Sequence, residues 1–566
     1  MKKNVNQKKQ NFVLGALILM ISGILCKVIG ACFKVPLTNM IGDDGMGYFN
    51  SAYSIYTVLF TISTAGIPVA VSRIISSYIV KKDALAVKRT FSMSLFILVV
   101  LGAISSLGMF LFADKLASDV IKNPEAVYAI KALAPTLLFI CIESSLRGYF
   151  QGHQNMTPTS VSQIIESFGK LIIGIVSASF AMSKGYALPI VSAYAILGIG
   201  IGAAGSCIYL LVCKIAYKKF DYGIMDISEK SPSAKQILIE IAVIAIPITL
   251  SSLVLSISNL VDSTVIMRCL QNSGLTLDAA RNLLAANPEY ALETMTDADI
   301  LAKGSNFLYG NYTSLAVTYF NLPLVLLTPL SVSVIPVLSE AFTKSDKEQI
   351  GGIVTSAFRI QSAVSLPCAM GLCVLAEPAL EVLFKRSSAE RAAPLLSILA
   401  ISIFFVAMTS VTNAVLQSLH KQWLPIISMA AGVAAKFASA FILISIPEVN
   451  IYGAPISTAI CYLVAMLTNF FFMSKYTHCL PGIRKVFLKP VLSAFACAVA
   501  ALGSYKILEA IIGKGRVITL AAIVVAALVY VVVLFVIGAL EKPDILLLPK
   551  GEKIYSLLKK AKLVKR

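Results

Sequence analysis

The sequence predicts an all-α polytopic membrane protein with 14 transmembrane helices, built as two parallel six-helix lobes plus two extra C-terminal helices. Of its 566 residues, 57% are hydrophobic and only 14% are charged, which excludes a soluble protein of this length. Basic residues gather in alternate connections between the apolar stretches, as they do in proteins that cross a membrane many times. The apolar stretches also carry an internal repeat.

Fourteen apolar stretches are long enough to cross the hydrocarbon of a bilayer as helices. The candidate spans are approximately residues 12–33, 48–72, 91–112, 128–150, 158–182, 189–213, 237–265, 306–339, 355–384, 392–417, 425–446, 452–473, 486–512 and 516–539. Four lysines and no acid precede the first span, and no small-residue cleavage site follows it. We therefore expect a retained first helix and not a cleaved signal peptide.

The charge of the connections predicts the orientation in the membrane. Basic residues dominate the amino terminus and the stretches 81–89, 214–235 and 475–489, whereas the connection 269–305 holds five acids and two bases. Because positive residues stay on the inner side, we expect a plasma-membrane protein with both termini in the cytoplasm. The tail 541–566 has eight Lys/Arg against three acids and predicts contact with anionic inner-leaflet lipids. This placement of the +19 net charge argues against nucleic acid as a partner.

Three short motifs recur in the same order, about 267 residues apart. The matches are Ile67-Pro68-Val69 with Ile335-Pro336-Val337, His153 before Pro158 with His420 before Pro425, and Pro189-Ile190 with Pro455-Ile456. Six spans per repeat give both copies the same polarity, which predicts two parallel lobes that rock about a shared axis. Proline disturbs the helical hydrogen bonds, so Pro68 and Pro336 predict hinges at matching depths.

The repeat also predicts the domain organisation. We expect an N-terminal lobe over residues 1–225 and a C-terminal lobe over 226–480, the latter with the extracytoplasmic loop 269–305. Residues 481–540 hold the last two spans, outside the repeat, and 541–566 form a basic cytoplasmic tail.

The first span carries two lysines on one helix face. Gly23, Lys27, Gly30 and Lys34 are spaced i, i+4, i+7 and i+11. Because glycine lets a neighbouring helix approach, we expect this face to look into protein or water. A cation at membrane depth is costly and marks a substrate or ion path. The alternative is that Lys34, just before Pro36, only reaches out to lipid headgroups.

Ionisable residues recur deep in later spans. Glu143 and Arg147, and likewise Glu166 and Lys170, stand four apart with the acid first, a favourable order on a helix. At 1.5 Å per residue from the start of the fifth span, Glu166 lies about 12 Å deep and Lys170 about 18 Å deep. Lys436 occupies the repeat position of Lys170. These cations are candidates for substrate binding, although such pairs also occur simply to neutralise each other between packed helices.

Two further charges lie nearer the ends of spans. Asp262, with Asn259 close by, stands near the outer end of the seventh span, where it either gates the outer side or marks the helix leaving the lipid. Arg73 follows the first Ile-Pro-Val motif at the inner end of the second span. It is a candidate substrate contact, and interfacial snorkelling is its commoner role.

The sequence lacks the motifs of nucleotide binding, metal binding and disulfide formation. No phosphate-binding Walker A loop is present, the three histidines are unpaired, and the eleven cysteines show no CxxC spacing. We therefore expect no cofactor, no metal site and no disulfide framework. Asp43-Asp44-Gly45 could serve a membrane glycosyltransferase, but Asp-Gly is first a turn signal. A transporter is expected and not an enzyme.

Three segments resemble one known family. Cys26-Lys27-Val28-Ile29-Gly30, Ile41-Gly42-Asp43 and above all Gly66-Ile67-Pro68-Val69-Ala70-Val71-Ser72-Arg73 resemble the polysaccharide-transport branch of the MOP flippase superfamily. Within it, the chain is similar over its whole length to the stage V sporulation protein B and MurJ-type lipid II flippases of Firmicutes. The resemblance implies a 6+6+2 helix arrangement. It also implies alternating access through a cationic central cavity, which moves an undecaprenyl-diphosphate-linked cell-wall precursor from the inner to the outer leaflet.

The same resemblance implies roles for particular residues. Lys27 stands where MurJ-type proteins carry a first-span arginine, which implies anion binding. The last two spans imply a groove for the lipid tail. The charge set is not transferable as a whole, since family arginines of the second and eighth spans are replaced by uncharged residues around Thr61 and Thr318.

Other functions stay open at this point. They are a flippase for another lipid-linked polysaccharide of O-antigen or teichoic type, a flippase for a sporulation-specific cortex precursor, a MATE-like drug or cation antiporter, and a membrane glycosyltransferase. The sequence leaves a coupling ion open, and we expect a monomer.

Overall fold

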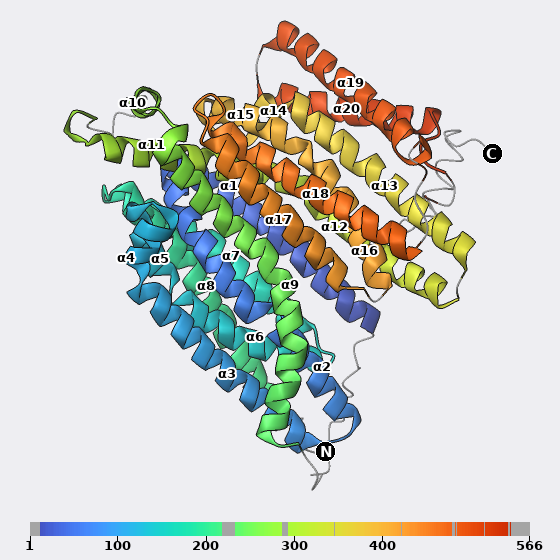
Figure 1. Cartoon of the computed structure of the whole chain (residues 1–566). Coiled ribbons are helices and arrows are strands. Elements are labelled where there is room, and N and C mark those ends of the chain that lie inside the picture. The colour runs from blue at the N-terminus through green and yellow to red at the C-terminus, as the bar shows by residue number, and fades with distance from the viewer. Residues whose placement is uncertain are drawn as a thin grey trace. The chain divides into compact units, whose positions relative to one another are not determined.

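The computed structural model describes residues 12–217, 232–285, 292–344, 346–419, 421–477, 482, 484–513, 515–541 and 544. These described residues form helices without a single strand, as Figure 1 shows. Thirteen of their segments are long and apolar enough to cross a membrane. The predicted all-α polytopic membrane fold is therefore confirmed. The first segment, Ile18–Val80, contains the first two predicted spans, and the total of 14 stays a prediction.

The chain divides into two compact units, Met1–Arg268 and Cys269–Arg566. The predicted lobe boundary after residue 225 was drawn from the sequence repeat, whereas these units are defined by packing. The predicted boundary therefore stays a prediction. The helices of the first unit are α1 (Phe12–Thr64), α2 (Ile67–Val80), α3 (Ala84–Leu111), α4 (Ala113–Lys115), η1 (Leu116–Ile121), η2 (Pro124–Ala126), α5 (Val127–Leu133), α6 (Thr136–Gly152), α7 (Thr157–Ser183), α8 (Leu188–Tyr217) and α9 (Ala234–Cys269).

Helix α1 bends sharply at Gly42. Its backbone there has φ 67° and ψ −173°, a conformation that glycine adopts readily and other residues avoid. The bend lies between the first and second predicted spans, so α1 joins both in one run of helix. Asp43 and Asp44 follow directly within helical backbone and are 3% and 2% exposed. The prediction of an Asp-Gly turn on a loop is therefore wrong: Gly42 makes the change of direction, and the two aspartates are buried beside it.

The packing of α7 against α8 depends on glycine. A Cβ at Gly198 would lie 2.3 Å from the backbone nitrogen of Gly174, and one at Gly169 would lie 2.3 Å from the Cα of Gly202. No side chain fits at these contacts. The two backbones touch directly, as in membrane helix pairs held by small residues.

The second unit is helical in the same way. Its elements are η3 (Leu270–Gly274), α10 (Leu277–Ala285), η4 (Leu292–Thr294), α11 (Asp297–Asn311), η5 (Tyr312–Ala316), α12 (Val317–Thr343), α13 (Lys347–Val374), α14 (Ala376–Leu383), α15 (Arg386–Ala400), α16 (Ser402–Ser418), α17 (Trp423–Ile444), η6 (Asn450–Tyr452), α18 (Gly453–Thr477), η7 (Arg484–Leu488), α19 (Lys489–Ile512) and α20 (Arg516–Val536). Helices α19 and α20 pair with each other, and α19 packs on α13.

The loop 269–305 contains the short helices η3, α10 and η4 before α11 begins at Asp297. Helix α10 lies against the start of α11, and an ion pair of 2.9 Å joins Arg281 to Asp297.

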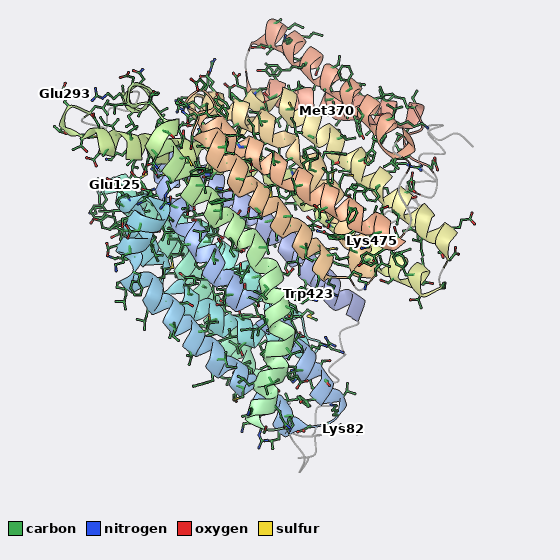
Figure 2. The ribbon with its side chains drawn as sticks, viewed as in Figure 1. Lys82, Glu125, Glu293, Met370, Trp423 and Lys475 are labelled. Carbon is green, nitrogen blue, oxygen red and sulfur yellow. The ribbon has the colours of Figure 1, made fainter. Side chains whose placement is uncertain are left out.

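Oppositely charged connections lie at opposite ends of each unit. Figure 2 shows Lys82, from a basic connection, and Glu125, from an acidic one, at opposite ends of the first unit. In the second unit Lys475 and Glu293 are likewise far apart along the helices (Figure 2). Alternation of this kind is what the orientation argument requires.

Candidate substrate site

Three charged side chains meet inside the first unit. The Nη2 atom of Arg147 on α6 lies 2.7 Å from Glu143 Oε2, one turn earlier on the same helix. The same nitrogen donates to Glu166 Oε2 on α7 at 2.9 Å. Glu143 is fully buried, and the side chains of Arg147 and Glu166 are 13% and 24% exposed. We call these three residues the Arg147 triad.

Two serines complete the surroundings of Arg147. Its Nε donates to Ser162 Oγ on α7 at 3.0 Å, and its Nη2 donates to Ser206 Oγ on α8 at 3.4 Å. The guanidinium therefore joins three helices. Sequence analysis missed both serines, because serine is common in membrane helices and only their shared neighbour sets them apart.

Lys170 lacks a carboxylate partner among the residues that the structure describes. Glu166 stands one turn before it on α7, yet it bonds Arg147 instead. The Lys170 ammonium lies 5.1 Å from the ring centre of Phe33 and 5.1 Å from that of Tyr53, both on α1. Two aromatic faces hold the cation without neutralising it. Lys34 is near enough to interact electrostatically with Lys170.

The rings at Lys170 belong to an aromatic stripe on α1. Phe49, Tyr53, Tyr56 and Phe60 follow each other with ring centres 5.5–6.0 Å apart, and Phe33 lies 5.9 Å from Phe49. Their spacing i, i+4, i+7 and i+11 marks one helix face. Sequence analysis missed this signal, although the same spacing led it to the lysines.

The remaining candidate residues are not gathered around the triad. Lys27 is exposed and has no ion pair within the described chain. A Cβ at Gly23 or Gly30 would meet no atom within 4 Å. No described residue fills the space over these two glycines, and the expectation that this face looks into protein or water stays a prediction. Arg73 on α2 is exposed, and Asp262 on α9 is half-buried.

Lys436 belongs to the second unit. It lies on α17, and only 5% of the residue is exposed. Its depth agrees with that of a residue inside a bundle, and its equivalence to Lys170 stays a prediction.

The two predicted hinge prolines occupy different positions in their helices. Pro68 is the second residue of α2, after α1 has already ended at Thr64. Pro336 lies within the helical run of α12. The interruption before α2 is tightly packed, since a Cβ at Gly66 would lie 2.1 Å from the carbonyl oxygen of Ala245. Hinge motion at either proline stays a prediction.

Three carboxylates gather where α14 and α15 meet. Glu377 and Glu381 on α14 and Glu390 on α15 could bring three oxygens within 4.8 Å of one another. Arg386 already pairs with Glu390 at 2.8 Å and contacts Glu381 at 3.5 Å. The arginine supplies the counter-charge of this cluster.

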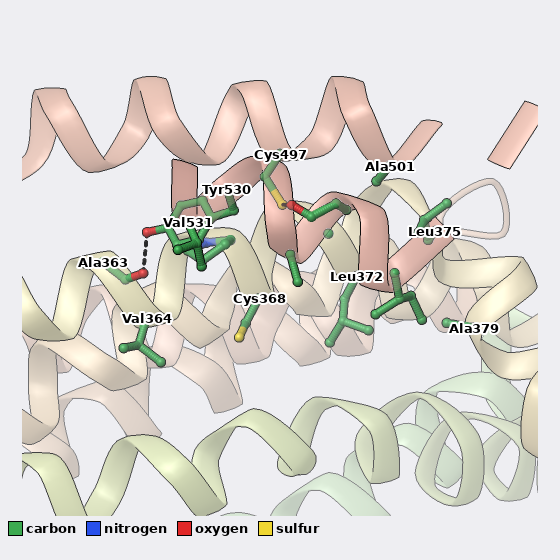
Figure 3. Close-up of a pocket in the computed structure, with 15 residues that line it drawn as sticks. Ala363, Val364, Cys368, Leu372, Leu375, Ala379, Cys497, Ala501, Tyr530 and Val531 are labelled. Atoms are coloured by element: carbon green, nitrogen blue, oxygen red, sulfur yellow. Dashed lines mark hydrogen bonds between the residues drawn. The ribbon is translucent and has the colours of Figure 1, made fainter. Parts of the chain in front are cut away.

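An apolar cavity of about 400 Å³ opens in the second unit (Figure 3). Helices α13, α14, α19 and α20 line it. Its lining is almost entirely aliphatic and includes the thiols of Cys368 and Cys497. The hydroxyl of Tyr530 donates to the carbonyl oxygen of Ala363, as the dashed line in Figure 3 marks. A cavity of this size and lining accepts hydrocarbon.

Comparisons with family models give two matches. A model described as "Polysaccharide biosynthesis protein" matches residues 12–342, more than half of the chain. A model described as "Lipid II flippase MurJ" matches residues 294–538.

Two relatives from Bacillus subtilis (strain 168) are similar over most of their length. The chain is 25% identical to "Stage V sporulation protein B" over 549 residues, which cover 96% of this chain and 98% of the relative. It is 24% identical to "Lipid II flippase MurJ" over 480 residues, which cover 82% of each.

Solved structures share the fold. The inward closed conformation of the lipid II flippase MurJ superimposes with a TM-score of 0.64 at 13% identity, covering 93% of this chain and 98% of the flippase. An inward-facing MATE multidrug transporter of the MOP superfamily gives a TM-score of 0.63 at 17% identity, covering 83% and 98%. The chain thus has the fold of MOP-superfamily transporters, and it belongs to the polysaccharide biosynthesis protein family.

Proposed function

We propose that the protein is a flippase that moves a polyprenyl-diphosphate-linked saccharide from the inner to the outer leaflet of the plasma membrane. Similarity to a lipid II flippase and to a sporulation protein of the same family supports a lipid-linked cell-wall precursor as the cargo. The finer assignment is an undecaprenyl-diphosphate-linked precursor resembling lipid II, moved by alternating access between two six-helix lobes. Both termini would be cytoplasmic, and the protein would act as a monomer.

The observation that carries the proposal is the state of Lys170. A membrane-depth ammonium is costly unless a counter-charge is present. Its own helix offers Glu166, but Arg147 engages that carboxylate at 2.9 Å. Lys170 is left between two aromatic faces, with no carboxylate partner among the described residues. A diphosphate would supply the missing negative charge.

The apolar cavity supports the same cargo. Its hydrocarbon lining suits the prenyl tail of a lipid that must stay within the membrane while its headgroup crosses. Because α19 and α20 form one wall, their presence outside the sequence repeat would be explained by this task.

The direction of transport follows from charge. A diphosphate headgroup cannot enter hydrocarbon unaided, because its charges would lose their hydration. Fixed cations replace that hydration. Movement of an anion outward is downhill on an inside-negative potential by about 2.3 kcal/mol per charge per 100 mV. No coupling ion is required by this argument.

The proposal is tested by Lys170→Met in proteoliposomes containing lipid II. Methionine keeps the length of the side chain and removes the charge. We expect at least a tenfold loss of translocated headgroup, measured by labelling from the outside. Lys184→Met is the matched control, because Lys184 also stacks on a ring of α7, Phe180 at 5.8 Å, but lies exposed at the helix end. Equal activity of both variants would refute the role of Lys170.

A complementation assay in cells identifies the headgroup of the transported lipid. Expression in a strain depleted of its lipid II flippase, with surface labelling of the precursor, should restore both growth and translocation. Translocation of another polyprenyl-linked glycan without rescue would move the assignment to that glycan. Drug efflux without movement of the precursor would show that the protein is a drug antiporter and not a flippase.

A further inference from the structure

A second buried arginine lies far from the Arg147 triad in the sequence. Arg359, on α13 of the second unit, is 5% exposed. Its Nη1 lies 2.8 Å from Glu541 Oε1 and 3.1 Å from Asp544 Oδ2. Both acids follow the end of α20, at the start of the segment that the sequence assigns to the basic tail. We call these three residues the Arg359 clasp.

The two acids of the clasp differ in how firmly they are held. Asp544 is 1% exposed, and its Oδ2 also accepts the backbone N–H of Glu541 at 2.7 Å. Ser356, one turn before Arg359, donates its hydroxyl to the same carboxylate. The side chain of Glu541 is 58% exposed, and its Oε1 is the atom that contacts Arg359. An ion pair with so exposed a partner is screened by solvent and contributes little to stability. The clasp can therefore open at the Glu541 side at little cost.

Arg359 has binding capacity that the clasp does not use. Its Nε is buried without a hydrogen-bond partner among the described residues. Guanidinium presents several donors in a planar fork, and phosphate oxygens match that fork as well as carboxylates do. A ligand that reached Nε and Nη1 together would satisfy a donor that is now unpaired.

The clasp lies at one end of the apolar cavity. Arg359 precedes the lining residue Ala363 by one helical turn, about 6 Å along the axis. The hydroxyl of Tyr530 donates a hydrogen bond to the carbonyl oxygen of Ala363, at this end of the cavity.

We propose that Arg359 is a loading site for the diphosphate of the polyprenyl lipid, and that Glu541 and Asp544 occupy it in the structure as an internal substitute. This inference rests on the proposed function for the identity of the lipid. The tail would lie in the cavity while the diphosphate displaces Glu541 and pairs with Arg359. Two carboxylates on one guanidinium stand in for the two phosphoryl groups.

The test reads lipid binding and not transport. In a chain whose only cysteine is Cys368, a cavity thiol, the rate of modification by N-ethylmaleimide reports occupation of the cavity. The variant Glu541→Gln with Asp544→Asn opens the clasp. In phosphatidylcholine vesicles it should react at least threefold faster than the parent chain. Addition of undecaprenyl diphosphate should slow its reaction at least threefold.

Controls separate the site from general effects. Glu340→Gln removes an exposed ion pair to Lys344 on α12 and should leave the labelling rate unchanged. Arg359→Met should abolish protection by the lipid. If the double variant does not fold, Glu541→Gln alone should give the same direction of change, because its side chain is largely exposed.

Two results would overturn the inference. One is a labelling rate that undecaprenyl diphosphate does not change. The other is equal protection by phosphatidylglycerol, which would make Arg359 a general site for anionic lipid. Lys170→Met should keep the protection even where it abolishes transport. A failed flippase assay and a failed loading site are therefore distinguishable.

Discussion

Replacement of Arg147 by methionine should destabilise the first unit more than any other change at the triad. The substitution leaves Glu143, which is fully buried, without its cation. Removal of one partner from a buried ion pair costs about 3–5 kcal/mol. Glu166→Gln should cost only about 1 kcal/mol, since Glu166 is 24% exposed and Arg147 keeps its bond to Glu143.

A third variant tests the cause of the loss. Arg147→Met combined with Glu143→Leu removes the buried pair together, and apolar replacements of buried pairs are often neutral or stabilising. We expect its unfolding free energy to return to within about 1 kcal/mol of the parent. The measurement is equilibrium unfolding in mixed micelles titrated with dodecyl sulfate. A double variant as unstable as Arg147→Met would refute the reasoning, because unpaired charge would then not be the source of the loss.

Two further predictions concern packing and pH. Gly198→Ala should destabilise the α7–α8 pair by about 1–3 kcal/mol, since the new Cβ would meet the backbone of Gly174 at 2.3 Å. The control is Gly108→Ala, because a Cβ at Gly108 meets nothing within 4 Å. This variant should not lose stability in the same unfolding assay. Burial raises the pKa of the Asp544 carboxyl above its ordinary value of about 3.9, against the opposing effects of Ser356, the Glu541 N–H and Arg359. The folded state then holds this proton more tightly than the unfolded state, so its contribution to stability is full below about pH 3.9 and is lost as pH rises through the folded pKa. Asp544→Asn should flatten that part of the profile of thermal midpoint against pH, and an unchanged slope would contradict the assignment.

Local patterns in the sequence predicted those parts of the structure that depend on a single helix. The spans follow from runs of apolar residues. The contact between Glu143 and Arg147 follows from their spacing of four. The partner of Glu166 could not be predicted in this way. Lys170, four residues away on the same helix, is the nearer cation along the chain, and the pairing with Arg147 depends on how α6 packs against α7.

Contacts between distant segments had no signal in one sequence. Arg359 and Asp544 are 185 residues apart, and Asp544 stands in a stretch whose composition indicates a basic cytoplasmic tail. Its burial depends on how the end of α20 returns to α13. The bend of α1 was also hidden, since Gly42 beside two aspartates has the composition of a surface turn. Only the tertiary fold decides that the aspartates turn inward.

The glycine contacts between α7 and α8 restrict how the first unit can deform. The backbones of α7 and α8 touch at Gly169–Gly202 and at Gly174–Gly198. Neither helix can therefore slide along the other without a steric clash between backbone atoms. In any movement of the first unit, α7 and α8 must therefore move together as one rigid body, and Lys170 on α7 moves with them. The bend at Gly42 lies on α1, outside these glycine contacts, so the restriction does not extend to it.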